Sequence, residues 1–178
     1  MIDRLEALCG RLNQFTATHL PLLARFVFAA VLARYFWASA ITKLDGAFTP
    51  ALGAYAQIFP RQLEAAGYDT SGFGAFHWLV IMAGTYAEFV LPALLIIGFA
   101  TRPAAFAMAG FIVVQSLTDV IGHHADPATI GMWFDRASDA LIMDQRAYWM
   151  LGLITLIGLG AGPVSVDGVI KRRLSRAV

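Results

Sequence analysis

Long runs of apolar residues, separated by shorter polar stretches, dominate this chain. Four runs lie at about residues 20–42, 77–100, 103–121 and 147–164. A helix needs about 20 largely apolar residues to cross a bilayer, and these runs lack the period of two that marks a strand. Backbone polar groups in lipid must be satisfied within their own segment. Each run is therefore predicted to be a transmembrane helix.

The polar stretches complete a prediction of one membrane domain over residues 1–178. Residues 1–19 carry apolar side chains at helical spacing, which predicts an amphipathic helix on the cytoplasmic leaflet. The two long connections hold aromatic and aliphatic residues, which predicts short helices at the outer surface, and residues 165–178 form a basic tail. The predicted fold class is an all-α integral membrane four-helix bundle with interfacial helices in the N-terminal segment and the outer loops. The apolar positions of the first segment are Ile2, Leu5, Leu8, Leu12 and Phe15.

The distribution of lysine and arginine predicts the orientation. Seven basic residues flank the runs on the side that holds both termini, and four lie on the other side. Basic residues near helix ends favour the cytoplasm, so both termini are predicted to be cytoplasmic, in a bacterial-type inner membrane. The first group is Arg4, Arg11, Arg102, Lys171, Arg172, Arg173 and Arg176, and the second is Lys43, Arg61, Arg136 and Arg146.

Composition supports a membrane protein and excludes several functional classes. The chain is 58% hydrophobic and 14% charged, whereas a soluble domain is roughly 45–50% apolar and 25% charged. The net charge of +1 argues against a nucleic-acid partner. Cys9 is the only cysteine, so a disulfide within the chain is excluded. No phosphate-binding loop, dinucleotide fingerprint, nucleophile elbow or zinc-protease motif occurs.

Polar side chains within the predicted helices are the candidate site, because such residues are costly in lipid. At about 1.5 Å per residue, three of them lie about 17–18 Å from the inner ends of their helices. Two tyrosines are sequence neighbours of this layer, and one aspartate lies a turn further out. The three residues at one level are Arg34, Glu88 and Gln115; the others are Tyr35, Tyr86 and Asp119.

Two interpretations of this polar layer stay open. In the first, Glu88 neutralises Arg34 and Gln115 completes the hydrogen bonds, so that the layer is structural. In the second, the layer binds a lipophilic ligand such as a quinone, whose carbonyls need hydrogen-bond donors and whose reduction needs protons. Arg25, near the inner end of its helix, is expected to extend its charge to the headgroups.

Histidines near the predicted outer surface are the weak candidates for a metal site. His123, His124 and Asp126 offer imidazole and carboxylate groups that suit several divalent metals. Adjacent histidines do not share a helix face, and the spacing fixes no third ligand. Solvated interface residues are the favoured interpretation, and no metal is predicted.

Three features together resemble the DoxX family of small four-helix membrane proteins, from about residue 24 to residue 167. An arginine opens the first helix and a lysine–leucine pair closes it. A glutamate in the second helix is followed by a glycine and a threonine–arginine turn, and the fourth helix ends in a glycine-rich sequence with a serine and an aspartate. These residues are Arg25, Lys43, Leu44, Glu88, Gly98, Thr101, Arg102 and the segment from Gly160 to Asp167. Ala40, where the family often has glycine, and the additional Arg34 are departures.

The resemblance implies an accessory or assembly subunit of a membrane complex, linked to quinone or thiol redox chemistry. It makes Arg25, Lys43, Glu88, Arg102 and Asp167 the family-like polar residues. The expected partners are the lipid bilayer and either a protein subunit or a second copy of the chain. The alternatives are a quinone-binding oxidoreductase subunit that uses the polar layer, and a metal-handling or small transport protein.

Overall fold

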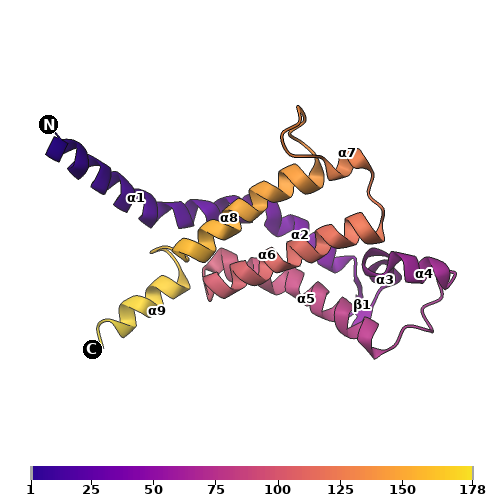
Figure 1. Ribbon diagram of the computed structural model, residues 1–178. Coiled ribbons are helices and arrows are strands. Elements are labelled where there is room, and N and C mark those ends of the chain that lie inside the picture. Colours follow the sequence, from indigo (N-terminus) through magenta and orange to yellow (C-terminus); the bar gives the residue numbers. More distant parts are fainter. Residues whose placement is uncertain (1, 178) are drawn as a thin grey trace.

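Four long helical stretches lie side by side in the computed structural model, which describes residues 2–177. Both ends of the chain lie at one end of this bundle, and the long connections lie at the other (Figure 1). We call these the terminal end and the loop end. The stretches are α1 (Ile2–Phe28) with the π-helical turn η1 (Ala29–Ala33) and α2 (Arg34–Ile41); α5 (Ala75–Ile97); α6 (Thr101–Leu117) with η2 (Thr118–Gly122); and η3 (Leu141–Gln145) with α8 (Arg146–Leu159).

The first three stretches are long and apolar enough to cross a membrane. The all-α membrane fold is therefore confirmed, and the chain is a multi-pass membrane protein. The fourth stretch is shorter, and Asp144, Gln145 and Arg146 lie in its first two turns. It nevertheless packs against α6 and α1 and returns the chain to the terminal end, as a fourth crossing requires (Figure 1).

The fourth stretch begins and ends earlier than the prediction of residues 147–164. It starts at Leu141, because Arg146 is held inside the bundle instead of lying in an outer loop. It ends at Leu159, because Gly160 and Gly162 adopt positive φ angles of 79° and 76°. Such angles suit glycine and do not continue a right-handed helix.

The first stretch is one helical segment from Ile2 to Ile41. Residues 2–19 are helical as predicted, but they continue into the membrane segment without a break instead of forming a separate short helix. The first sixteen of them are exposed and project from the bundle (Figure 1). Contact with the bundle begins near Pro21, which is buried within α1 and packs close to Gly162.

Aromatic and small apolar side chains form the core between α1, α2, α5, α6 and α8. Phe28, Leu32 and Phe36 project from the first stretch against Leu153 and Leu156 of α8. Alanines on α6 let its neighbours approach closely, in the way that small residues do between membrane helices. These alanines are Ala104, Ala105 and Ala109.

Short elements cover the loop end, as predicted. A small antiparallel hairpin, β1 (Leu44–Gly46) with β2 (Thr49–Pro50), follows the first stretch. Helices α3 (Leu52–Ile58) and α4 (Pro60–Ala65) come next, and α7 (Pro127–Ile130) lies in the second connection. A last helix, α9 (Val166–Leu174), leads away from the terminal end.

Candidate functional site

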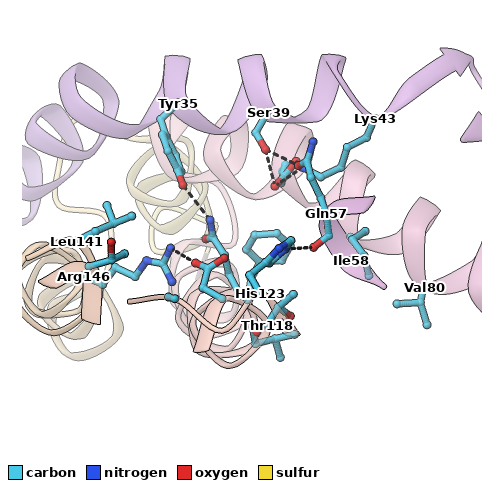
Figure 2. A pocket seen from close by; sticks show the side chains of 18 residues that line it. Tyr35, Ser39, Lys43, Gln57, Ile58, Val80, Thr118, His123, Leu141 and Arg146 are labelled. Carbon is cyan, nitrogen blue, oxygen red and sulfur yellow. Dashed lines mark hydrogen bonds and ion pairs between the residues drawn. The ribbon is translucent and has the colours of Figure 1, made fainter. Parts of the chain in front are cut away.

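A cavity of about 410 Å³ lies at the loop end, between α2, α3, α5, α6, η2 and η3. Polar side chains from several of these elements point into it (Figure 2). Tyr35 and Val114 line the cavity and are 39% and 62% exposed, so the cavity opens on the outside of the bundle. Its volume lies within the range of about 300–1,000 Å³ typical of small-molecule sites.

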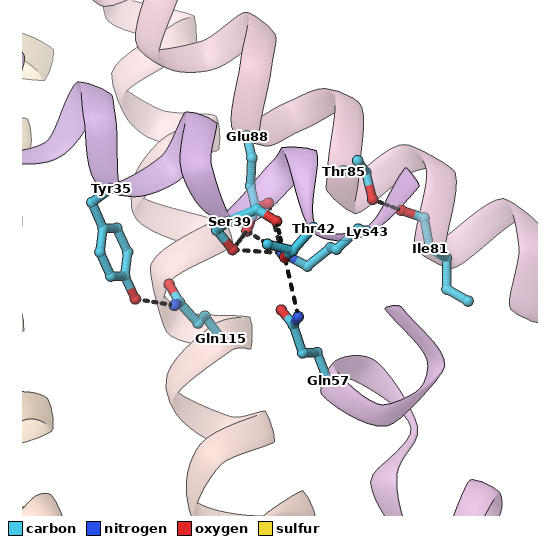
Figure 3. A network of polar contacts seen from close by, with 9 residues as sticks. All are labelled: Tyr35, Ser39, Thr42, Lys43, Gln57, Ile81, Thr85, Glu88 and Gln115. Atoms are coloured by element: carbon cyan, nitrogen blue, oxygen red, sulfur yellow. Dashed lines mark hydrogen bonds and ion pairs between the residues drawn. The ribbon is translucent and has the colours of Figure 1, made fainter. Parts of the chain in front are cut away.

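A buried ion pair between Lys43 and Glu88 forms one wall of the cavity. The ammonium Nζ lies 3.0 Å and 2.7 Å from the two carboxylate oxygens, and both side chains are under 10% exposed. Ser39 accepts a hydrogen bond from Lys43 at 2.6 Å and donates one to Glu88 at 3.2 Å (Figure 3). Ser39 lies in the last turn of α2, and Lys43 lies in the turn that follows the end of the helix at Ile41. Three groups, from α2, the turn after it and α5, therefore form one closed polar unit.

Arg34, which the sequence placed opposite Glu88, does not take part. Its side chain is exposed, and no ion pair or hydrogen bond of its side chain is found among residues 2–177. The structure corrects the proposed Arg34–Glu88 pair, and the reason is angular. Ser39, the α2 residue that bonds Glu88, is five residues beyond Arg34, which is about 140° around a helix of 3.6 residues per turn. Arg34 was predicted to lie at the same depth as Glu88, but it projects from a different face of its helix.

A second ion pair, between Arg146 and Asp119, lies at the opposite wall. An Arg146 guanidinium nitrogen lies 2.5 Å from the carboxylate, and another donates to Ser116 at 2.8 Å. Arg146 is 3% exposed and its guanidinium lies 6.0 Å from the ring centre of Trp149. Sequence reasoning had counted Arg146 among the outer-loop charges. The sequence feature that could have identified it is the position of Arg146 directly before an apolar run. An arginine at such a position can form an ion pair inside the bundle as well as face water.

Tyr35 and Gln115 meet between the two ion pairs. The Gln115 amide donates to the tyrosine oxygen at 2.9 Å, so the phenol keeps its own proton for another acceptor. The Gln115 Oε1 and the Arg146 Nε are buried without a hydrogen-bond partner among the described residues. Tyr35 also packs on Trp149, with ring centres 5.5 Å apart. The cavity thus has aromatic side chains and a phenol donor at its wall, whereas the two unpartnered atoms lie beneath its surface.

Of the two remaining candidates nearest the cavity, one lies outside it and one lines it. Tyr86 does not line the cavity, and its hydroxyl donates to the Ala47 carbonyl on the bundle surface. His123 lines the cavity and bonds the Gln57 carbonyl at 2.9 Å.

The weak metal candidates have separate contacts. His124 contacts Arg61, and Asp126 caps α7 through the amides of Ala128 and Thr129. The Thr129 hydroxyl also donates to Asp126, at 2.8 Å, and this bond first, followed by the amide bonds, holds the pKa of the Asp126 carboxyl below its usual value. Within residues 2–177, no group of three or more histidine, cysteine, aspartate or glutamate side chains could hold a metal.

Arg25 anchors a different polar cluster at the terminal end. Its guanidinium donates to four carbonyls: Leu95 and Ile96 at the end of α5, and Ala161 and Val164 beyond α8. The donor–acceptor distances are 2.5–3.0 Å. Helix ends leave their last carbonyls without partners, and a buried arginine satisfies several at once. The expected extension of Arg25 to the headgroups is therefore wrong, because the side chain is 7% exposed.

Gly98 and Asp167 complete this terminal cluster. The Asp167 carboxylate accepts hydrogen bonds from the amides of Ala100 and Thr101 at 2.8 and 2.9 Å, which fixes the start of α6. Burial by itself raises the pKa of the Asp167 carboxyl, but the Thr101 and Ala100 bonds and the charge of Arg25 hold that pKa below its usual value. Gly98 has a φ of 68°, and a Cβ there would lie 2.6 Å from Ser165 and 2.8 Å from Arg25.

The family-like residues therefore divide between two places. Lys43 and Glu88 lie in the cavity, whereas Arg25 and Asp167 lie in the terminal cluster. Arg102 lies at the terminal end, where it donates to the Gly158 carbonyl at 3.0 Å.

Comparison with known proteins gives one match, to a family model. Neither the curated proteins nor the solved structures gave a match to this chain. The model for the family described as DoxX matches residues 20–121, which is more than half of the chain and holds both Arg25 and the Lys43–Glu88 pair. The chain belongs to the DoxX family.

Proposed function

We propose that this chain binds a quinone in the loop-end cavity, as the quinone-binding accessory subunit of a complex in a bacterial-type cytoplasmic membrane. The observation that carries the proposal is the Tyr35–Gln115 pair. Its geometry leaves the phenol proton free to donate into a cavity that is aromatic on one side and opens on the bundle surface. A lipophilic ring with carbonyl acceptors fits this combination, and it can enter from lipid.

The cavity residues supply binding and proton handling. A bound quinone would take up two protons with two electrons, and the electrons would come from a redox-active subunit of the same complex. The Tyr35 hydroxyl donates a hydrogen bond to a carbonyl oxygen, and the ring of Phe111, which lines the cavity, provides packing surface. The Lys43–Glu88 unit holds an acid and a base in contact at the cavity wall, so either group can exchange a proton with a ligand there. A single proton gained or lost leaves the charge of the other group unpaired, and a second proton transfer must restore the pair.

The exposed start of α1 favours an accessory role within a larger assembly. Residues 2–17 project from the bundle, and their apolar stripe contacts no other part of the described chain. We expect a partner subunit there. Chemical cross-linking of the full chain in its native membrane tests this, because loss of one heterologous cross-linked product in Leu8→Glu/Leu12→Glu supports the role. Unchanged products would contradict it.

Quinone retention and rebinding test the main proposal. The full chain is purified in mild detergent, its quinone content is measured after solvent extraction, and a short-chain quinone is titrated while tryptophan fluorescence is followed. Tyr35→Phe removes one hydroxyl and is expected to weaken binding roughly five- to thirty-fold, the value of one hydrogen bond of about 1–2 kcal/mol.

Tyr86→Phe is the matched control, because it removes a hydroxyl from the same kind of residue outside the cavity. It should bind quinone like the unaltered chain. Equal weakening in the two variants, or no saturable quenching in the unaltered chain, would overturn the proposal. Trp149→Phe should reduce the quenching amplitude, because Trp149 packs against Tyr35.

A further inference from the structure

A cationic cleft lies at the terminal end, far from the loop-end cavity. It has a volume of about 510 Å³ and is formed by the start of α6, the glycine-rich segment after α8, and α9. Three basic side chains line it, Arg102, Lys171 and Arg172, against the single carboxylate of Asp167. The cleft therefore has an excess of positive charge.

The carboxylate in this cleft is already occupied by protein donors. Asp167 accepts the Ala100 and Thr101 amides, and no ion pair with a cleft lysine or arginine is found within residues 2–177. Arg102 and Arg172 each use one guanidinium nitrogen on a backbone carbonyl, at 3.0 and 2.9 Å. Both keep further N–H donors, because a guanidinium carries five. The cleft can thus still bind an anion.

An apolar groove adjoins the cleft. It has a volume of about 530 Å³ and shares Pro163 and Arg172 with the cleft, so these two residues separate the charged hollow from the apolar one. Val164 is 65% exposed and Val169 is 42% exposed. The other apolar residues that line the groove are Ile97, Pro163 and Val166.

We propose that this end of the molecule binds one anionic phospholipid, with its phosphate in the cleft and an acyl chain along the groove. The argument is charge complementarity combined with adjacency. Cationic groups beside exposed apolar surface, at the end of a membrane-crossing bundle, match the two parts of such a lipid. A free phosphate ion would use the cleft but not the groove. The site lies on the side that the basic residues place in the cytoplasm.

Native mass spectrometry of the full chain in mild detergent tests the proposal, with phosphatidylglycerol and phosphatidylcholine as probes. Phosphatidylglycerol should bind with at least tenfold preference. Arg102→Gln/Lys171→Gln should weaken its binding roughly thirty-fold, since each basic residue near an anionic surface contributes about 1 kcal/mol. Arg173→Gln/Arg176→Gln removes the same charge from residues that line neither hollow and should change binding less than threefold.

Two further measurements distinguish a bound phospholipid from a free phosphate ion. Val169→Ser should weaken lipid binding, and inorganic phosphate at millimolar concentration should not displace the lipid. Displacement by phosphate with no effect of Val169→Ser would show an ion site and overturn the proposal. Equal binding of the two lipids, or equal loss in the two double variants, would overturn it as well. Quinone retention should be unchanged in every variant, so the two proposals fail separately.

Discussion

The terminal cluster and the loop-end cavity are both buried and polar, but they use their hydrogen bonds differently. Arg25 and Asp167 bond backbone groups at helix ends, which pins α1, α5, α6 and the segment after α8 together. Lys43 and Glu88 bond each other, and Gln115 and Arg146 keep unpartnered atoms. Bonds to the backbone fix the fold, whereas side-chain pairs can be rearranged around a ligand. The first cluster therefore holds the bundle together, and the second is suited to binding.

The largest effect is expected when the cavity ion pair is broken on one side. Glu88→Leu leaves the Lys43 ammonium buried without its partner, which typically costs about 3–5 kcal/mol. Lys43→Met/Glu88→Leu removes both charges and should recover more than half of that loss, because apolar pairs can replace a buried ion pair. Equilibrium unfolding in mixed micelles, followed by circular dichroism, measures both. A double variant no more stable than the single one would place the pair among the groups that fix the fold.

A smaller loss of stability is expected when the terminal cluster is disrupted. Arg25→Met removes the donors of four carbonyls and should lower the free energy of unfolding by about 2–4 kcal/mol, partly offset by water at the bundle end. Arg34→Met is the matched control on the same helical stretch, and it should change the free energy by less than about 1 kcal/mol because Arg34 is exposed. The same unfolding assay applies. Similar losses in both would erase the distinction between the two arginines.

Much of the fold was predictable, because long apolar runs in lipid have few alternatives to a helix. The π-helical turns were not, since each inserts a residue into a helix and rotates the later turns without an obvious signal in composition. Two of them, η2 and η3, border the cavity and carry Asp119 and Leu141. Because such a rotation changes which side chains face inward, the candidate site could be predicted only in part.

Depth along a helix can be counted from sequence, but the direction in which a side chain points needs the packing. Glu88 and Gln115 were predicted to lie at one level, and both line the cavity. Lys43 and Arg146 became their neighbours only through the fold. The terminal cluster was harder to predict than the cavity, because Arg25 donates to backbone carbonyls. Every residue carries such a carbonyl, so the sequence does not indicate which of them would accept.

A substitution at Gly98 tests whether the terminal cluster is packed too tightly to accept another atom. Gly98→Ala adds a Cβ at a positive φ and within 2.8 Å of Arg25, which should cost about 2 kcal/mol from backbone strain and crowding. Gly152→Ala is the control, because its Cβ would meet nothing within 4 Å inside α8. The control should stabilise the helix by about 0.5–1 kcal/mol. Thermal unfolding followed by circular dichroism compares the two variants. Equal melting temperatures would contradict the prediction, because they would mean that the terminal cluster accommodates the added Cβ without strain.

The smallest effect concerns the pH dependence that Asp167 gives to the terminal cluster. Its folded-state pKa lies below the unfolded value of about 3.9, so the stabilisation is present above that pH and is lost as the pH falls through the folded pKa. Asp167→Asn should lower stability at pH 7 by about 1 kcal/mol, a value discounted for partial exposure. The gap between the two proteins should stay constant from pH 8 to 5 and shrink below pH 4, because protonation then removes the same charge from the unaltered chain. Unfolding measured across that range decides the point, since a gap independent of pH would mean that shape rather than charge holds the start of α6.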